Sequence, residues 1–531
     1  MNSYNCKIKD YIQPFERKLA LKELSTISGV SPSAGANQSN FIVETNIRLG
    51  TLAERLAYWE SISSQSSSRV TIQSQREASI NAVRNGIDLE TLKKILPFSD
   101  PIPLPNRRCL RYGTHGIHEY RGKFFPQLVR SLINIAGASK KAIVADPMSG
   151  SGTTIVEAAL MGCHGIGLDM NPLSVFIGNT KCELLKSDPS KIKSSYLKVR
   201  ESVLAPEDRK KSPLNYFSTL SAEDQEYLKN WFSDDVLNGL DDIVKAISDV
   251  KYKPAKNLMW VSLSNVLRTV SWQKDDDLRV RKEVRLDKEI DPKLEFLEEL
   301  GRSVRAILAF LYQNGSETDI KYDIVDGDAR QFSSVWKEFR NKVDVVITSP
   351  PYATALPYLD TDRLSLIYLG LLKRQEHRAH DHKMIGNREI SEKLRKDYLV
   401  QLSVGKSELP KSVHELIKKI ESKNEGTDAG FRRRNLPALL AKYFFDMRAV
   451  LSEVYSALKP GGTAFFVVGN NHTIAGGQRV DILTANLLED IAGMLNFEIQ
   501  DSISMEMLIS RDIFKKNASE SEKILVLKKP R

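Results

Sequence analysis

The stretch Val343-Asp-Val-Val-Ile-Thr-Ser-Pro-Pro-Tyr352 places a short apolar run directly before a rigid polar turn. Because four of its first five residues are apolar and two prolines follow, it predicts a buried parallel strand over 343–347 that ends in a turn. The turn offers the Ser349 hydroxyl, backbone carbonyls and the aromatic face of Tyr352. These groups suit a planar ring with an exocyclic amine, since oxygen atoms accept hydrogen bonds from the amine while the tyrosine stacks on the ring. The alternatives are an ordinary strand exit and a proline-rich ligand.

A second stretch, Asp146-Pro-Met-Ser-Gly-Ser-Gly-Thr-Thr154, follows a short apolar segment, 142–145, and precedes a helical pattern over 155–161. Residues 165–168 form the next predicted strand, which ends at Asp169. A strand, a glycine loop, a helix, a second strand and an acid in this order are typical of a nucleotide-binding βαβ unit. The alternative is a tight strand-to-helix turn with Asp169 as a helix cap.

The chemistry of this unit narrows the ligand. Gly150 and Gly152 allow the backbone to approach a ligand closely, and the following helix offers free amides. Asp169 lies about 20 residues past the loop, where an acid can bind both ribose hydroxyls. No lysine follows Gly152, as a phosphate-binding loop would require, and the third glycine of a dinucleotide site is missing. S-adenosylmethionine fits better, because it needs only a ribose acid and free amides.

Composition sets the general class of protein. The chain has 531 residues, of which 41% are hydrophobic and 27% charged, so it predicts a globular protein with more than one domain. Its net charge of +10 favours a polyanionic partner. Four cysteines form no paired framework, and no apolar run approaches the roughly 18 residues of a membrane span. The start lacks a signal-peptide pattern, so we expect a cytoplasmic, nucleoid-associated protein with no membrane contact.

The two motifs together resemble the amino-group DNA methyltransferases, which act on cytosine N4 or adenine N6. Asp146–Thr154 is similar to their cofactor loop, and Thr348-Ser-Pro-Pro-Tyr352 to their Asp/Asn/Ser-Pro-Pro-Tyr tetrapeptide. Gly122-Lys-Phe-Phe-Pro126 resembles the element that touches the methionine part of the cofactor. The resemblance implies an α/β fold with a seven-stranded Rossmann-like class I S-adenosylmethionine-dependent methyltransferase core, a final antiparallel strand, and large, mainly helical insertions.

The resemblance also implies roles for individual residues. Asp328, with Asp326 as its rival, is expected to bind the adenine amine of S-adenosylmethionine. The expected catalytic residues are Ser349, Pro350, Pro351 and Tyr352. The expected cofactor-binding residues are Lys123, Phe124, Asp146, Met148, Gly150, Gly152, Thr153, Asp169, Asn171, Asp328 and Ser349. No metal site is expected, because the histidines between positions 377 and 382 are separated by charged residues and predict a solvated loop.

The pattern of the chain suggests four kinds of segment. Residues 1–105 form an accessory region whose serine-rich stretches, 31–40 and 61–68, predict loops. The catalytic core is expected over 106–175, 320–372 and 436–531, with a helical insertion over 176–319 and a basic insertion over 373–435. Either insertion could recognise the target.

Basic residues within the insertions are the candidate contacts with double-stranded DNA. Arg279 and Arg281 lie in a mixed-charge stretch, for which a solvated helix face is the alternative. Arg432, Arg433 and Arg434 follow a flexible segment, for which the alternative is a plain surface loop.

The expected reaction is a direct transfer of a methyl group to the exocyclic amine of a flipped base. A cytosine C5 enzyme would need a nucleophilic cysteine, usually after proline, and none of the four cysteines follows one. Ser349 favours cytosine N4 over adenine N6. An RNA guanine-N2 methyltransferase and a non-catalytic methyltransferase-like DNA-binding subunit remain alternatives. A cognate restriction endonuclease or a defence-system subunit would be a further partner.

Overall fold

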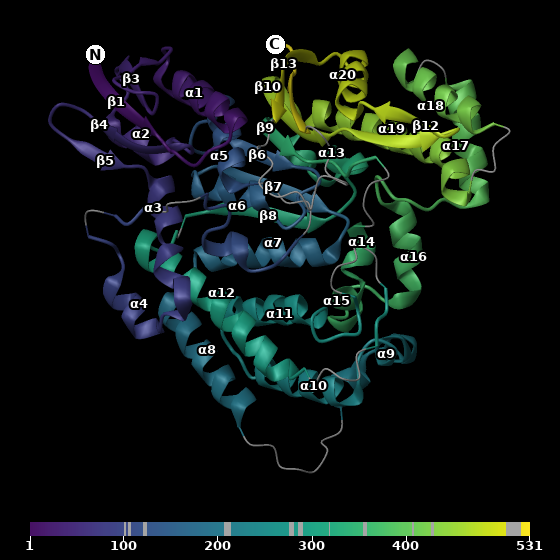
Figure 1. Ribbon diagram of the computed structural model, residues 1–531, viewed down its shortest axis with the longest axis horizontal. Helices are drawn as coiled ribbons and strands as arrows, with labels where there is room; N and C mark the ends of the chain where they lie inside the picture. The colour runs from purple at the N-terminus through teal and green to yellow at the C-terminus, as the bar shows by residue number, and fades with distance from the viewer. Residues whose placement is uncertain are drawn as a thin grey trace.

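The computed structural model describes residues 1–99, 102–104, 108–120, 125–205, 214–274, 281–284, 290–317, 319–353, 358–405, 408–425, 430–505 and 522–531. Its centre is a seven-stranded sheet with the order β13-β14-β10-β9-β6-β7-β8 (Figure 1). The strands are β6 (Ile143–Asp146), β7 (His164–Asp169), β8 (Lys321–Asp326), β9 (Val343–Thr348), β10 (Leu458–Gly469), β13 (Glu498–Met505) and β14 (Glu522–Lys528).

The topology of this sheet confirms the predicted fold class. The strands from β8 to β10 are parallel, whereas β14 runs antiparallel between β10 and β13. The chain starts at β6, moves outward through β7 to β8, and returns to β9 on the other side of β6. The strand order therefore reverses between β6 and β9, and ligands of open α/β sheets bind at the carboxyl ends of the strands around such a point.

Alternating side chains give the sheet two apolar faces. On β9, Val345 and Ile347 point to one face, where α1 (Pro14–Ser28) and α5 (Pro126–Ile135) pack. Val346 points to the other face, which α19 (Phe431–Ala457) and α20 (Thr484–Met494) cover. Residues at both sheet faces are almost fully buried, so the core of the protein consists of helices packed on a twisted sheet.

The N-terminal region folds into a second sheet, with the order β2-β3-β1-β4-β5. The prediction of loops or linkers over the serine-rich stretches was only partly correct, because both stretches include short strand segments, in which β2 pairs with β3 and β4 pairs with β5. The elements of this region are β1 (Asn2–Ile8), β2 (Ser33–Ala34), β3 (Asn40–Thr45), α2 (Leu49–Arg55), β4 (Trp59–Ser63), β5 (Ser68–Val70), α3 (Ile72–Ala78) and α4 (Leu89–Ile95).

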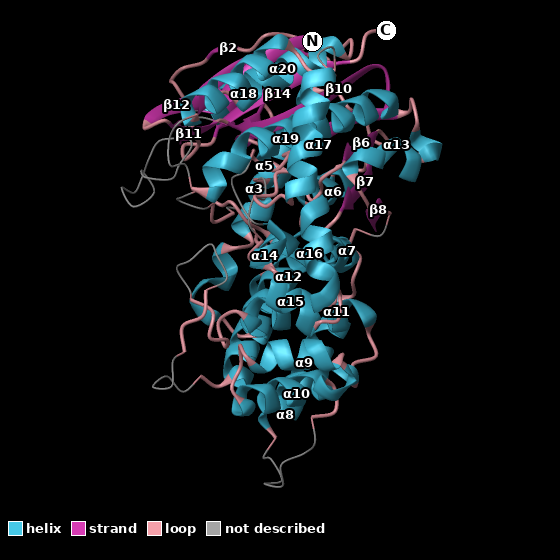
Figure 2. Cartoon of the chain, turned by 90° about the vertical axis from the view of Figure 1, so that its right-hand side faces the viewer, coloured by secondary structure: helices cyan, strands magenta, loops and turns pink. Residues whose placement is uncertain are grey.

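A helical layer lies below the main sheet, as Figure 2 shows. It comprises α7 (Pro172–Leu185), α8 (Pro189–Leu204), α9 (Ala222–Lys229), α10 (Asp234–Ser248), α11 (Lys253–Leu267) and α12 (Pro292–Asn314). Leu359 and Leu366, which belong to α14 (Tyr358–Thr361) and α15 (Arg363–Tyr368) after the Ser-Pro-Pro-Tyr turn, are buried in the same apolar cluster. The helical layer is therefore packed directly against the chain that leaves this turn.

Three further helices follow α15: α16 (Arg374–Lys383), α17 (Glu392–Val404) and α18 (Lys411–Asn424). The solvated loop expected around the three histidines is thus helix α16, and the His377 side chain is buried. A short helix, α13 (Phe332–Val335), and a hairpin of β11 (Asn471–Ala475) and β12 (Gln478–Ile482) complete these elements. Within the described ranges, none of the helices combines the length and the apolar character that crossing a bilayer requires.

Candidate active site

The two sequence motifs meet because they leave neighbouring strands. Val144 of β6 pairs in parallel with Val345 of β9, so the glycine turn after β6 and the Ser-Pro-Pro-Tyr turn after β9 start at the same sheet edge. Thr154 links the two: its hydroxyl lies 2.8 Å from Asp146 Oδ2 and 3.4 Å from the carbonyl oxygen of Ile347. The first helical turn of α6 (Thr153–Leu160) therefore touches the end of both strands.

The glycine turn has a backbone that other residues would not adopt. Gly150 and Gly152 have φ angles of +47° and +80°, in the left-handed region that favours glycine. A β-carbon at Gly152 would lie 2.9 Å from the Cα atom of Gly178 on α7, so this turn is pressed against a helix backbone. At Gly150, a β-carbon would lie 3.0 Å from the ring of Tyr120.

Asp146 anchors this turn from inside the protein. It is only 1% exposed, and its carboxylate accepts hydrogen bonds from the Thr154 hydroxyl and from the backbone amide of Met148, at 2.8 and 3.1 Å. Burial raises the pKa of Asp146 from 3.8 to about 7. The side chain thus holds the turn in shape.

Asp169 links the glycine turn after β6 to the segment that follows β7. Its two carboxylate oxygens accept hydrogen bonds from the backbone amides of Gly150 and Asn171, both at 2.8 Å. Removal from water raises the pKa of Asp169 to about 6, and the nearby negative charge of Asp326 contributes in the same direction. Asn171 is fully buried, caps α7 by accepting from the Leu173 amide, and donates to Asp362 at 2.8 Å.

The two candidate acids after β8 differ in their surroundings. Arg330 clamps both carboxylate oxygens of Asp328, with contacts of 2.9 and 2.6 Å, and also pairs with Asp446 on α19 at 2.7 Å. Asp326 is exposed and lies opposite Asp169 in the register of β7 and β8. The carboxylate of Asp328 is therefore already engaged, whereas Asp326 faces the same edge as Asp169.

The Ser-Pro-Pro-Tyr turn is held by contacts on several sides. The Tyr352 ring lies against Gly469 at the end of β10, and its hydroxyl donates to Glu522 at the start of β14. Asn471 donates to the carbonyl of Ala353 at 3.1 Å. Ser349 is half-buried at the start of this turn.

The structure adds residues that the sequence did not indicate. Lys181 on α7 is fully buried, and its ammonium group donates to the carbonyl and the hydroxyl of Ser151 at 2.8 and 2.9 Å. The Tyr120 hydroxyl accepts from Ser174 at 2.8 Å. A lone lysine within the apolar pattern of residues 172–185 is the signal that could have identified Lys181.

The predicted DNA-contacting residues belong to different parts of the fold. Arg433 and Arg434 are exposed in the first turn of α19, so this basic run starts a helix instead of lying in a loop. Arg281 is exposed beside an antiparallel bridge between Gln273 and Lys282, which excludes the helix-face interpretation there. Lys123, Phe124, Arg279 and the side chain of Arg432 lie outside the described residues.

A polar cleft of about 450 Å³ opens beside the site, between α11, α15 and the segment that leads to Tyr120. Tyr120 and Asp362 belong to its walls, and they contact Gly150 and Asn171 respectively. Arg268 also lines this cleft. The cleft is thus continuous with residues that shape the glycine turn and the end of β7.

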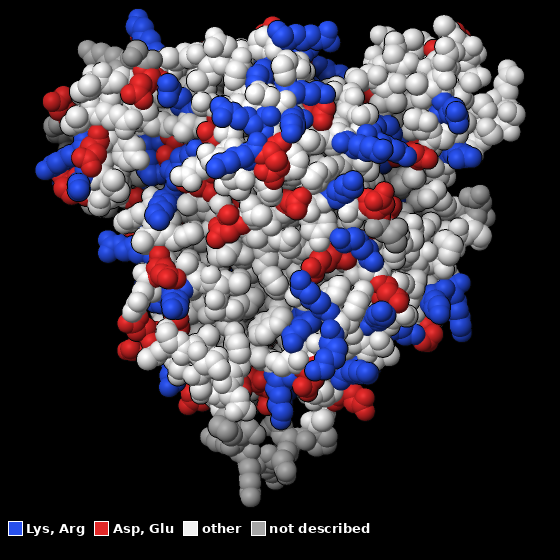
Figure 3. All heavy atoms as spheres, turned by 180° about the vertical axis from the view of Figure 1, so that it is seen from behind, with Lys and Arg blue, Asp and Glu red and all other residues white. Residues whose placement is uncertain are grey.

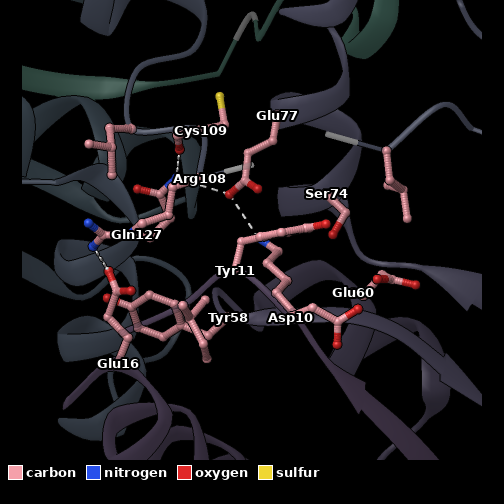
Figure 4. Close-up of a pocket in the computed structure, with 14 residues that line it drawn as sticks. Asp10, Tyr11, Glu16, Tyr58, Glu60, Ser74, Glu77, Arg108, Cys109 and Gln127 are labelled. Atoms are coloured by element: carbon pink, nitrogen blue, oxygen red, sulfur yellow. Dashed lines mark hydrogen bonds and ion pairs between the residues drawn. The ribbon is translucent and has the colours of Figure 1, made fainter. Parts of the chain in front are cut away.

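A smaller cavity of about 60 Å³ lies between the N-terminal sheet and α5 (Figure 4). It contains none of the predicted site residues. In its wall, Arg108 pairs with Glu16, and Glu77 accepts from Lys9 at 2.8 Å and from Gln127 at 3.0 Å. These contacts connect the N-terminal region to the core.

The fold and the paired turns define an S-adenosylmethionine-dependent methyltransferase, and comparisons with known proteins agree. The family model described as "UPF0020: RMKL-like, methyltransferase domain" matches residues 118–202. The chain is 22% identical to the Type II methyltransferase M.BsoBI of Geobacillus stearothermophilus, over 76% of this chain and 84% of that protein. It is 25% identical to the Type II methyltransferase M.MvaI of Kocuria varians, over 71% of this chain and 81% of that protein.

These relatives confirm the methyltransferase resemblance that the sequence predicts. Among solved structures, TrmN from Thermus thermophilus aligns over 99% of this chain and 100% of that chain with 11% identity. The TM-score of 0.33 is too low for any inference from that alignment.

Proposed function

We propose that this protein transfers a methyl group from S-adenosylmethionine to an exocyclic amine of double-stranded DNA, with cytosine N4 as the acceptor. The observation that carries the proposal is the pairing of β6 with β9, which places the glycine turn and the Ser-Pro-Pro-Tyr turn at one sheet edge. The similarity to M.BsoBI and M.MvaI supports a DNA substrate, and Ser349 at the first position of the tetrapeptide supports cytosine N4.

The chain has the groups that S-adenosylmethionine requires. The glycine turn is packed so closely against α7 that a β-carbon at Gly152 would meet Gly178, and α6 begins directly after this turn with backbone amides that have no partner within the helix. Asp169 and Asp326 stand opposite each other at adjacent strand ends, where a ribose and an adenine amine offer donors. Met148, Thr153, Asn171 and Asp328 shape this surface, and Lys123 and Phe124 are assigned from the sequence. When bound, the cofactor supplies a methyl group attached to a sulfonium sulfur, and the rest of the cofactor is the leaving group of the transfer.

The catalytic turn would hold the acceptor base. The amine is a poor nucleophile because its lone pair is delocalised into the ring. Hydrogen bonds from the amine to the Ser349 hydroxyl and the Pro350 carbonyl favour a pyramidal nitrogen with a directed lone pair. Tyr352 stacks on the base, which has to leave the duplex to reach this position. Positioning and electrostatic stabilisation supply the rate enhancement.

The DNA duplex would contact the two insertions, 176–319 and 373–435, whose limits are a prediction from the sequence. Arg281, Arg433 and Arg434 are exposed and suit phosphate contacts. On the face shown in Figure 3, Lys and Arg gather towards the top and are interleaved with acids, so the excess of positive charge forms no uninterrupted stripe there. A cognate endonuclease or defence-system partner and a location at the nucleoid are further parts of the proposal.

Methyl incorporation tests this proposal. The protein is incubated with labelled S-adenosylmethionine and either duplex DNA or transfer RNA, and the nucleosides are then identified by mass spectrometry. We expect N4-methylcytosine in DNA from the wild type and no incorporation with Tyr352→Ala, although that variant still binds S-adenosylhomocysteine. Label in transfer RNA alone would contradict a DNA substrate. Tight DNA binding without any incorporation would indicate a non-catalytic subunit.

A further inference from the structure

Helix α16, which the sequence placed in an insertion expected to contact DNA, crosses the carboxyl edge of the main sheet. Its His380 donates from Nε2 to the carbonyl of Met170, at the end of β7, with a distance of 2.6 Å. One turn later, the carbonyl of Lys383 accepts from Arg330, in the loop after β8, at 2.9 Å. α16 therefore contacts the loops that follow two neighbouring strands.

The turn after α16 continues these contacts to the catalytic turn. A β-carbon at Gly386 would lie 3.0 Å from both the Pro351 side chain and the Tyr352 carbonyl, and the φ angle of Gly386 is +75°. The carbonyl of Met384 also accepts from Lys442 on α19 at 3.1 Å. Residues 380–386 thus link the ends of β7, β8 and β9 in one short segment.

α16 is held firmly in this position. At its first residue, the backbone amide of Arg374 donates to Asp224 on α9 at 2.8 Å, and the guanidinium group lies 5.1 Å from the centre of the Tyr227 ring. Its buried His377 contacts the backbone of Leu359 on α14. α16 is therefore fixed at its start, middle and end. Such a fixed helix suits the wall of a ligand site better than a segment that adapts to DNA.

His380 is the residue of this wall that contacts the end of β7, next to Asp169, where the nucleoside is expected. Met170, whose carbonyl it contacts, follows Asp169 directly, and His380 is close enough for a positive charge on its ring to favour the ionised form of Asp169. A carbonyl only accepts hydrogen bonds, so Nε2 carries the proton. In the neutral ring Nδ1 is then an acceptor, which matches the hydroxyl and amine donors of an adenosine.

We propose that His380 is a cofactor-contacting residue, which closes the adenosine end of the S-adenosylmethionine site from the α16 side. The inference deepens the proposed function and rests on it, because it takes the ligand at Asp169 to be S-adenosylmethionine. It assigns a part of residues 373–435 to the cofactor instead of DNA. The ring of His380 would contact the nucleoside through Nδ1 while its Nε2–H group continues to donate to the Met170 carbonyl.

Ligand binding measured by calorimetry tests this assignment without relying on activity. S-adenosylhomocysteine and 5′-methylthioadenosine, which lacks the amino-acid part, are titrated into the wild type, His380→Ala and His380→Gln. We expect His380→Ala to weaken binding of both ligands by the same factor, about tenfold, which is the size of one lost polar contact. The matched control is His382→Ala, because side chains two residues apart on a helix point about 200° away from each other, and it should bind as the wild type does.

The glutamine variant separates ligand contact from structural support. Its amide nitrogen can still donate to Met170, so His380→Gln should unfold at the wild-type temperature and yet bind both ligands several-fold more weakly. Wild-type affinity in His380→Gln, or in a folded His380→Ala, would overturn the assignment. A wild-type protein that binds neither ligand would instead contradict the proposed function, so the two failures are distinguishable. If His380→Ala does not fold, His380→Gln carries the same comparison.

Discussion

The ring of Tyr352 lies directly over Gly469: a β-carbon at position 469 would be 2.6 Å from the ring atoms Cε2 and Cζ. No real β-carbon approaches a ring so closely, so the glycine makes room for the Tyr352 ring. Because Tyr352 also donates to Glu522, its ring is fixed between the ends of β10 and β14. The position of this ring therefore depends on the absence of one side chain.

Gly469→Ala should displace the Tyr352 ring and lower kcat by about 10- to 100-fold, since a small misplacement of a positioned group is costly in catalysis. The affinity for S-adenosylhomocysteine should stay within about twofold, because the glycine turn is on another strand. Steady-state kinetics and calorimetry measure the two quantities. Gly493→Ala on α20, where nothing lies within 4 Å of the new β-carbon, is the matched control. Equal loss of kcat in both variants would show that the effect is not due to Tyr352.

Cofactor affinity should fall at acidic pH because Asp169 takes up a proton. The pKa of Asp169 is raised to about 6, so the carboxylate is ionised above pH 7 and progressively protonated below pH 6. Protonation weakens its hydrogen bonds from the amides of Gly150 and Asn171 and its capacity to accept from ribose hydroxyls. We expect the dissociation constant of S-adenosylhomocysteine to rise by up to about tenfold per pH unit below 6. Asp169→Asn should bind more weakly at pH 8 and show a flatter profile, whereas a flat wild-type profile from pH 5 to 8 would refute this role.

In the ligand-free protein, the stability of Asp146→Asn relative to the wild type should increase as pH rises. The folded-state pKa of Asp146 is about 7, above its ordinary value of 3.8, so the native state retains a proton that the unfolded chain releases. Stability from this group is complete below about pH 4 and is lost as pH rises through 7. Asparagine does not titrate, and its oxygen can still accept from Thr154. The Tm of the variant minus the Tm of the wild type should therefore increase from pH 5 to pH 8. A decrease of this quantity over the same range would contradict the prediction.

Neutralising Arg433 and Arg434 should weaken DNA binding equally for all sequences. Each lost phosphate contact should reduce the slope of log K against log salt by about 0.9. The double variant Arg433→Gln/Arg434→Gln is compared with Lys140→Gln/Lys342→Gln, whose exposed cations precede β6 and β9 at the opposite sheet edge. Fluorescence anisotropy at several salt concentrations measures both slopes. An unchanged slope in the Arg433→Gln/Arg434→Gln variant would show that the start of α19 does not contact DNA.

The main sheet and its two turns could be predicted because their signals are local. β6, the glycine turn and the helix after it occupy consecutive residues, and Ser349 follows β9 directly. The N-terminal sheet could not be predicted, because β2 has only two residues and β5 three, and their pairing depends on partners elsewhere in the chain.

The contacts missed at the site are non-local. His380 reaches Met170 across 210 positions and Glu522 reaches Tyr352 across 170, so no pattern around either residue indicates its role. For Asp328, the position after β8 could be predicted from the sequence, but its contacts could not. Nothing in the sequence shows that Arg330, two residues later, donates hydrogen bonds to both oxygens of its carboxylate.

The central claim is that a methyl group held by the glycine turn is transferred to a base amine held by Ser349 and Tyr352. Sequencing with detection of modified bases, applied to DNA from cells that express the protein, tests it most directly, with Tyr352→Ala as the control. We predict N4-methylcytosine at one fixed position of a short recurring sequence with the wild type, and unmodified DNA with the variant. Methylation at cytosine C5, or identical DNA from both strains, would contradict the account.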